Sequence, residues 1–226
     1  MKKYLVWDLP VRLFHWLLVI CLIAQWLTAE VLDDMLNIHF YIGYFTLSLI
    51  IFRFFWGFIG SRYAKFSSFL AGPKAIYQYL SALVSKQPLN SVGHNPLGGL
   101  LLPAILLLVG AQAISGLFTT DDILSEGPYY SNASSAVQNI MQWLHHNVYL
   151  VIVALVVLHL VAITWYRLVL KNDLIGPMLH GQKAVPKSEG ISHSHLFRAL
   201  ILAIIVGIFV YWLVAINPPP VEAYYY

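Results

Sequence analysis

Charged residues are scarce in this sequence. Asp, Glu, Lys and Arg make up 10% of its 226 residues, whereas hydrophobic residues make up 59%. Soluble domains carry about a quarter charged residues, so this chain has too few polar groups to cover a globule in water. The composition excludes an ordinary soluble domain and predicts a helical membrane protein surrounded by a lipid bilayer, with no nucleic acid among its partners.

Cysteine and intramembrane carboxylates are nearly absent as well. The single Cys21 cannot form a disulfide within the chain, so it does not indicate the redox compartment. The apolar stretches contain no Asp or Glu, and no cysteine accompanies their histidines. A zinc site usually takes three or four such ligands close together, which makes zinc a poor candidate.

Long apolar stretches are what the chain has instead. A membrane-spanning helix takes roughly 20 mostly apolar residues, and five stretches qualify, at residues 9–28, 37–60, 97–118, 144–170 and 196–216. Backbone groups inside lipid have to bond within the chain, so each stretch is predicted to be a helix. A signal peptide is the alternative for the first stretch, because Lys2 and Lys3 precede it. Arg12 and His15 interrupt that stretch, and no small-residue cleavage site follows it, which argues against this alternative.

The charges between the stretches predict an orientation. With the N-terminus inside, all 13 Lys and Arg residues fall in the inner segments or the helix ends beside them, at residues 1–12, 61–96 and 171–195. No basic residue and seven acidic ones fall in the outer segments, at residues 29–36, 119–143 and 217–226. This positive-inside pattern predicts a bacterial inner-membrane protein with a cytoplasmic N-terminus and a periplasmic C-terminus.

The segments between the stretches have some features of their own. Residues 73–85 are predicted to form a helix at the inner interface, because Pro73 suits a first helical turn and the apolar residues after it repeat at helical spacing. An ordinary connector is the alternative. The outer segment 119–143 is long enough to contact a partner, and the prolines at 218–220 with the tyrosines at 224–226 indicate an extended stub near the outer surface.

Histidines are the most informative residues. Nine occur, and five lie inside or at the ends of the apolar stretches: His15, His39, His145, His146 and His159. Ionisable side chains inside a membrane are costly and usually functional. A helix–helix hydrogen bond would explain one such histidine, but five together indicate a cofactor site. The other four are expected to be inner loop residues: His94, His180, His193 and His195.

The spacing of these histidines predicts two cofactors. His145 and His159 are 14 residues apart, close to four helical turns, so they share a helix face and lie about 21 Å apart along the axis. One haem cannot bridge that distance, whereas two stacked haems fit it. His146 points about 140° away from His159, which favours His145 over His146 as the ligand.

Each haem with two histidine ligands needs its second ligand from another helix. His15 lies near the inner end of the first helix, and His39 opens the second helix at the outer side. Their depths pair His15 with His159 and His39 with His145. We therefore predict two haem b groups with these four histidines as axial ligands of the haem iron.

Four further residues are predicted to be haem neighbours. Gly43 follows His39 by one turn and would leave room for a porphyrin, while Arg12 and Arg53 would pair with haem propionates. Close helix packing is the alternative for Gly43, and snorkelling to the inner surface is the alternative for the arginines. His146 is a candidate neighbour because it adjoins His145.

Several sequence pieces accompany these histidines. They are the run WDLPVRLFHW at 7–16, His39 with Gly43-Tyr44, Arg53 with Trp56-Gly57, the run GSRYAKF at 60–66 and the run GHNPLGG at 93–99. Jointly they resemble the prokaryotic di-haem cytochrome b561 family, which includes the cytochrome b subunits of nickel–iron hydrogenases. The resemblance implies that His15, His39, His145 and His159 are haem ligands, and that the chain exchanges electrons with the quinone pool and a redox partner. His94 belongs to the last run without a clear role. A fifth helix departs from the many members that stop after four.

The predicted fold is all-α. Residues 1–170 form a four-helix transmembrane bundle that holds two b haems, and residues 171–226 add an inner loop, a fifth C-terminal transmembrane helix and a short periplasmic tail. The leading hypothesis is a di-haem b-type cytochrome of a respiratory chain. It would transfer electrons between quinone or quinol and a periplasmic partner, either a c-type cytochrome or a hydrogenase or dehydrogenase subunit. A stand-alone quinone-linked superoxide oxidase is the alternative, and a haem-free membrane anchor or transporter is a third hypothesis.

Overall fold

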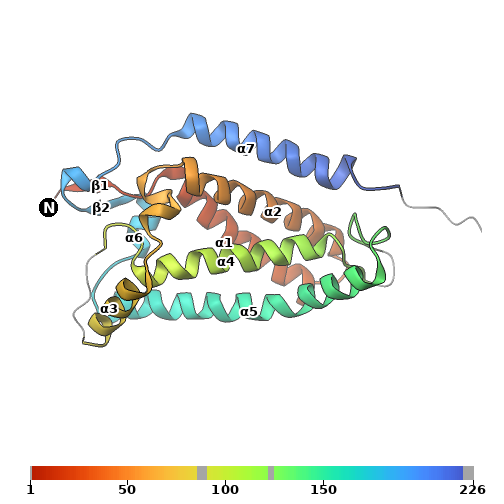
Figure 1. Cartoon of the computed structure of the whole chain (residues 1–226), viewed down its shortest axis with the longest axis horizontal. Helices are drawn as coiled ribbons and strands as arrows, with labels where there is room; N and C mark the ends of the chain where they lie inside the picture. Colours follow the sequence, from red (N-terminus) through yellow and green to blue (C-terminus); the bar gives the residue numbers. More distant parts are fainter. Residues whose placement is uncertain (1, 86–90, 122–124, 221–226) are drawn as a thin grey trace, which may run out of the picture. The chain divides into compact units, whose positions relative to one another are not determined.

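Five long helices dominate the computed structural model, which describes residues 2–85, 91–121 and 125–220 (Figure 1). They are α1 (Leu9–Glu30), α2 (Leu36–Ile59), α4 (Pro96–Gly116), α5 (Ser135–Leu168) and α7 (Leu196–Tyr211), which continues into the π-helix η4 (Trp212–Ile216). Each is long and apolar enough to cross a membrane. The prediction of five transmembrane helices is confirmed, and the chain is an all-α multi-pass membrane protein.

Short elements occur between the long helices. They are β1 (Lys3–Leu5), η1 (Arg62–Ala64), η2 (Phe66–Ser68), α3 (Pro73–Val84), α6 (Ile175–His180), β2 (Gln182–Ala184) and η3 (Lys187–Glu189). The helix predicted at 73–85 is present as α3, and its place at the membrane interface stays a prediction. The strands β1 and β2 pair antiparallel, with Tyr4 opposite Lys183. Three residues are too few to show an alternating pattern, so the sequence did not reveal these strands.

The helix α5 begins earlier than predicted. Its first residue is Ser135 rather than Leu144, so the last part of the outer segment 119–143 is helical and the prediction of its extent was wrong. Hydropathy marks only the continuously apolar part of a helix, and the first turns of α5 mix polar residues with apolar ones. Ser134, which precedes the helix, is a residue type favoured at helix N-termini. Of the predicted tail, the tyrosines at 224–226 lie outside the described residues.

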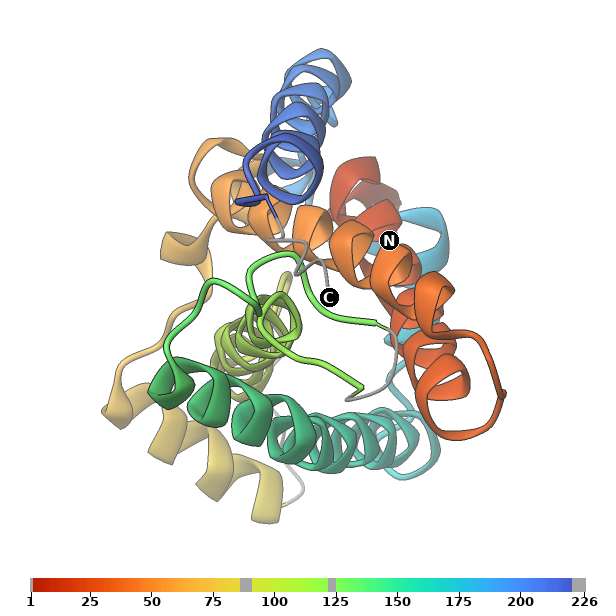
Figure 2. The ribbon, with the colours of Figure 1, turned by 90° about the vertical axis from the view of Figure 1, so that its right-hand side faces the viewer.

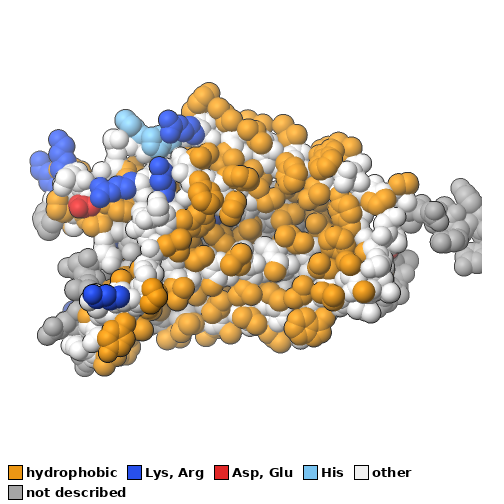
Figure 3. Space-filling view, viewed as in Figure 1, with side chains coloured by type: hydrophobic (Ala, Val, Ile, Leu, Met, Phe, Trp, Pro, Cys, Tyr) orange, Lys and Arg blue, Asp and Glu red, His pale blue; other side chains and the backbone are white. Residues whose placement is uncertain are grey.

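The chain divides into two compact units, each of which takes a part of every long helix. Unit 1 comprises Met1–Trp16, Arg53–Leu106 and Val153–Leu200, and unit 2 comprises Leu17–Phe52, Leu107–Ile152 and Ile201–Tyr226. All 13 Lys and Arg residues belong to the ranges of unit 1, whereas seven of the ten acidic residues belong to unit 2. The Lys and Arg side chains visible in Figure 3 accordingly lie over elements of unit 1, and hydrophobic side chains cover the long helices. The division at residue 170 stays a prediction.

In unit 2 the fifth helix packs against the second. Figures 1 and 2 show α7 alongside α2, and a buried apolar cluster joins them: Leu47, Leu117, Val206 and Val210. The Tyr129 hydroxyl donates a hydrogen bond to the Leu213 carbonyl oxygen at 2.7 Å, within η4. This bond ties the end of the fifth helix to the segment between α4 and α5.

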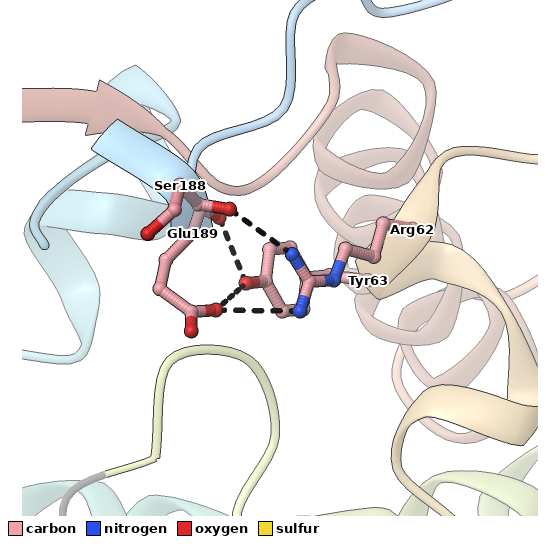
Figure 4. Close-up of polar contacts among 4 residues, drawn as sticks. All are labelled: Arg62, Tyr63, Ser188 and Glu189. Atoms are coloured by element: carbon pink, nitrogen blue, oxygen red, sulfur yellow. Dashed lines mark hydrogen bonds and ion pairs between the residues drawn. The ribbon is translucent and has the colours of Figure 1, made fainter. Parts of the chain in front are cut away.

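In unit 1 the N-terminal strand, the loop after α2 and the segment around β2 share a small core of Val6, Tyr63 and Val185. The Tyr63 hydroxyl donates to Glu189, whose carboxylate also pairs with Arg62 at 3.4 Å (Figure 4). Burial and the hydrogen bond to Glu189 raise the pKa of Tyr63 to about 12. Position 181 favours glycine because its φ is +83°. The Gly181 carbonyl oxygen accepts hydrogen bonds from the amides of Val6 and Trp7.

Candidate cofactor sites

Unit 2 brings together one of the predicted histidine pairs. The ring centres of His39 on α2 and His145 on α5 lie 6.2 Å apart, and their planes are inclined by 80°. Both side chains are partly buried. Each residue comes from the first or second turns of the apolar part of its helix, so the two helices present their rings to one another at the same level.

The hydrogen bonds of His39 indicate which of its ring nitrogens carries the proton. His39 Nδ1 lies 3.2 Å from Thr28 Oγ1. The single hydroxyl proton of Thr28 is donated to the Ala24 carbonyl oxygen at 2.8 Å, so the Thr28 oxygen accepts from His39 Nδ1. His39 Nε2 then keeps a free lone pair, as a metal ligand requires. Gln25 adds a second contact, because its side-chain amide donates to the His39 carbonyl oxygen at 3.0 Å.

The hydrogen bonds of His145 resemble those of His39. His145 Nδ1 lies 3.0 Å from the Gln112 carbonyl oxygen and 3.2 Å from Ser115 Oγ. A carbonyl oxygen only accepts, so Nδ1 carries the proton and Nε2 is free to bind a metal ion. The Gln112 side-chain amide donates to the His145 carbonyl oxygen at 2.8 Å. Each histidine of this pair therefore has a hydroxyl on its ring and a glutamine amide on its backbone.

Gly116, the last residue of α4, lies against the ring of His145. A Cβ atom at this position would lie 2.9 Å from His145 Cε1 and 3.3 Å from Nδ1. No larger residue fits here without moving the ring. Glycine at 116 is thus part of the space that holds His145 in place.

Unit 1 brings together the other predicted pair. The ring centres of His15 on α1 and His159 on α5 lie 6.5 Å apart, with 57° between their planes. His15 Nδ1 is buried and has no hydrogen-bond partner among the residues that the structure describes. The ring of His159 likewise makes no hydrogen bond to any described residue. This pair has nearly the spacing of the first pair but lacks its hydrogen bonds.

A buried polar cluster occupies the same unit. Asp8 is 1% exposed, and its Oδ1 accepts the amide of Val11 at 2.7 Å, which caps the start of α1. Its Oδ2 accepts from Trp56 Nε1 at 3.2 Å and from the Ser61 hydroxyl. Asp8 thus joins the first turn of α1 to the end of α2.

Arg53 is fully buried within this unit. Its guanidinium carbon lies 5.4 Å from the centre of the Phe66 ring, and all three guanidinium nitrogens lack a hydrogen-bond partner among the described residues. Asp8 attracts it electrostatically without a direct hydrogen bond. A buried cation is costly unless anionic or hydrogen-bonding groups surround it, so Arg53 fits a site that receives an anionic group.

His94 lies between aromatic rings in unit 1. Its ring centre is 4.5 Å from that of Phe69 and 4.7 Å from that of Trp7, and its Nδ1 is buried without a partner among the described residues. Removal from water, and then the nearby positive charge of Arg53, lower the pKa of His94. Burial thus favours the neutral form of His94, and its ring neighbours are Trp7 and Phe69.

The remaining predicted neighbours differ in their surroundings. His146 is exposed, and its Nδ1 contacts the Gln142 carbonyl oxygen of its own helix at 2.8 Å. Arg12 donates to the Leu179 carbonyl oxygen at 2.6 Å. A Cβ atom at Gly43 would lie 3.3 Å from Gln25 Nε2, so this glycine adjoins the amide that supports His39. His180, His193 and His195 lie outside the long helices.

The two pairs fit a haem with two histidine ligands. An imidazole nitrogen lies about 2 Å from a metal that it binds, and the ring centre lies about 1 Å beyond, so rings on opposite sides of one metal ion have centres about 6 Å apart. The measured separations of 6.2 and 6.5 Å match this value. Among the described residues, no three His, Cys, Asp or Glu side chains gather at a possible metal site. A haem needs only two protein ligands, and the buried guanidinium of Arg53 suits its carboxylates.

Fold and site together define a helical membrane protein with two histidine pairs whose ring spacing suits a haem. The sequence model of the prokaryotic cytochrome b561 family matches residues 6–181, well over half of the chain. The chain belongs to this family, whose members are b-type cytochromes. The resemblance noted in the sequence is thereby confirmed.

Individual relatives agree with this assignment. The chain is 26% identical over 145 residues to a probable Ni/Fe-hydrogenase 1 B-type cytochrome subunit of Escherichia coli (strain K12). This match covers 50% of this chain and 60% of the relative. It is 24% identical over 210 residues to a probable Ni/Fe-hydrogenase B-type cytochrome subunit of Azotobacter chroococcum mcd 1, covering 78% of this chain and 86% of the relative. The match thus spans about three-fifths of the length of the first relative. No solved structure matches the chain significantly.

The hydroxyl and amide residues around the rings of His39 and His145 were not predicted from the sequence. Thr28, Ser115, Gln25 and Gln112 all lie within long apolar helices, where polar side chains commonly bond to neighbouring helices. Their polarity within apolar helices was the only indication in the sequence that they bond to another helix. It does not identify the partner of each residue, because the rotation and tilt of the helices determine which side chains meet.

Proposed function

We propose that this chain is a di-haem b-type cytochrome that passes electrons across the bacterial inner membrane, between the quinone pool and a periplasmic redox partner. The observation that carries the proposal is the presence of two histidine pairs with ring centres 6.2 and 6.5 Å apart, one in each unit. His39 and His145 would bind one haem iron, and His15 and His159 the other.

The roles of the protein residues follow from their contacts. When bound, haem supplies the one-electron chemistry. His39 and His145 offer Nε2, because Nδ1 of each is committed to a hydrogen bond. Arg53 would pair with a propionate in unit 1, and the apolar faces of the long helices would keep water from the irons.

Orientation and partner are part of the same proposal. By the positive-inside rule, the basic residues support a cytoplasmic location for the loops of unit 1 and a periplasmic location for those of unit 2. The relatives named as hydrogenase subunits make a Ni/Fe hydrogenase the first candidate for the partner at unit 2. A c-type cytochrome or another dehydrogenase subunit would use the same face. Quinone would then exchange electrons at the haem of unit 1.

The experiment is to purify the chain in detergent, measure haem per chain, and reconstitute it into liposomes with a quinol. We expect two b haems per chain, reduction of both by the quinol, and reoxidation by a membrane-impermeant oxidant on the side of unit 2. His15→Ala should stop reduction by quinol, whereas His146→Ala, a change at an exposed histidine outside both pairs, should not.

Three results would contradict the proposal. A chain without haem would favour the membrane anchor or transporter. A haem content of one per chain would remove the second site. Rapid reduction of quinone by superoxide, catalysed by the isolated chain, would instead identify the stand-alone oxidase.

A further inference from the structure

The two histidine pairs differ in the atoms that contact their Nδ1 nitrogens. In unit 2, Nδ1 of His39 donates to Thr28 Oγ1 at 3.2 Å, and Nδ1 of His145 donates to the Gln112 carbonyl oxygen at 3.0 Å and contacts Ser115 Oγ at 3.2 Å. In unit 1, His15 Nδ1 and the His159 ring make no hydrogen bond to any described residue. From this difference we infer that Thr28 and Ser115 are positioning residues that make the haem of unit 2 the lower-potential haem. This inference rests on the proposed function.

The physical link runs through the imidazole ring. A hydrogen bond from Nδ1–H to an acceptor leaves more electron density on the ring and makes Nε2 a stronger donor. A stronger axial donor stabilises the oxidised iron and lowers the reduction potential. Both rings of unit 2 have such an acceptor, so the two effects act on the same haem.

The acceptors are themselves held in place. Thr28 and Ser115 each donate their own hydroxyl proton to a carbonyl oxygen of their helix, at 2.8 Å to Ala24 and 3.0 Å to Gln112. The Thr28 oxygen can therefore accept from His39, whereas the Ser115 oxygen shares the single Nδ1 proton of His145 with the Gln112 carbonyl oxygen. The amides of Gln25 and Gln112 fix the histidine backbones at 3.0 and 2.8 Å, so each ring stays aligned with its hydroxyl.

Charge acts in the same direction. Unit 1 contains every Lys and Arg residue, including the fully buried Arg53, while most acidic residues belong to unit 2. Positive charge near a haem stabilises its reduced form, and negative charge stabilises its oxidised form. Hydrogen bonding and charge thus both place the lower potential in unit 2.

The order of potentials sets the favoured direction of the electron. One electron given up by a partner at unit 2 would move to the haem of higher potential in unit 1 and then to a quinone, which takes two electrons and two protons to become a quinol. Thr28 and Ser115 would therefore favour electron flow from the partner toward quinone, which is the direction that a substrate-oxidising partner needs.

The test is a spectroscopic redox titration of the purified chain with both haems bound. We expect two midpoint potentials, the lower of which disappears in His39→Ala. Thr28→Val should raise the lower midpoint, so that the ratio of reduced to oxidised haem at a fixed potential rises several-fold. Ser115→Ala leaves the Gln112 carbonyl oxygen as an acceptor for His145 and should raise the lower midpoint less. Neither change should move the higher midpoint. Thr28→Ser keeps the hydroxyl, so its lower midpoint potential should equal that of the parent chain.

A matched control is Ser48→Ala. Ser48 donates to a carbonyl oxygen of its own helix in unit 2, as Ser115 does, but contacts no histidine, so its removal should move neither midpoint. The inference is overturned if both haems are bound and Thr28→Val and Ser115→Ala leave the lower midpoint unchanged, or if the lower midpoint is the one that survives in His39→Ala. A parent chain with fewer than two haems would overturn the proposed function instead, so the two failures are distinguishable.

Discussion

The two histidine pairs of this protein have similar spacing but different surroundings. Ring centres are 6.2 Å apart in unit 2 and 6.5 Å apart in unit 1, which suits the same cofactor in both. The His39 ring contacts a hydroxyl oxygen, and the His145 ring contacts a hydroxyl and a backbone oxygen, whereas unit 1 contains the buried Arg53 and Asp8. The two pairs thus share their spacing, and the polar groups around them are the difference between the units.

The largest expected effect breaks one pair without touching the other. Gly116→Ala places a Cβ atom 2.9 Å from His145 Cε1, so the ring has to rotate away from His39. We expect the haem of unit 2 to be lost while that of unit 1 remains, as measured by haem content and reduced-minus-oxidised spectra. The control is Gly110→Ala in the same helix, where the new Cβ atom would lie 3.5 Å from Ile50 and fits. Equal haem content in both variants would show that Gly116 does not hold the ring.

A smaller effect tests the polar cluster that only unit 1 has. Asp8→Ala removes the cap of α1 and the buried carboxylate that accepts hydrogen bonds from Trp56 and Ser61. We expect a loss of roughly 3 kcal/mol in the free energy of unfolding, visible as a lower Tm in detergent. Asp173 is a matched cap, because its Oδ1 accepts two amides at the start of α6 but is exposed. Asp173→Ala should cost about 1 kcal/mol or less, and an equal loss in both variants would mean that burial of Asp8 adds nothing.

The smallest effect concerns the pH dependence of unit 1. The pKa of Tyr63 is raised to about 12 from its ordinary value of 10.0, so the folded state favours the protonated phenol. This contribution is fully present below pH 10 and is lost as the pH rises toward 12. Tyr63→Phe should therefore flatten the fall of Tm over that range. Tyr77→Phe, at a side chain that is 74% exposed, should keep the parent profile, and a parental slope in Tyr63→Phe would contradict the assignment.

The sequence was sufficient for the helices and for the pairing of the histidines. Apolar length alone locates α1, α2, α4, α5 and α7, because lipid requires helices of a minimum length. The depths of His15, His39, His145 and His159 along those helices place them in the pairs that the structure brings together. His146 was set aside by helical geometry, and it is exposed in the structure.

The sequence was insufficient where a contact depends on how helices rotate against one another. Thr28 and Ser115 look like ordinary hydroxyl residues of apolar helices, and only the packing of α1 on α2 and of α4 on α5 brings them to the rings. The strands β1 and β2 pair residues about 180 positions apart, with no local pattern to predict it. The first turns of α5 mix polar and apolar residues, so apolar length alone does not mark them as part of a helix.

The most direct test of two haems on two histidine pairs is haem content after replacement of each ligand. Each of His15→Ala, His39→Ala, His145→Ala and His159→Ala should reduce the haem bound per chain by one, and His15→Ala should leave the same spectrum as His159→Ala. His146→Ala should bind the full parental amount. Loss of haem in His146→Ala, or matching spectra for His15→Ala and His39→Ala, would contradict the pairing on which the account depends.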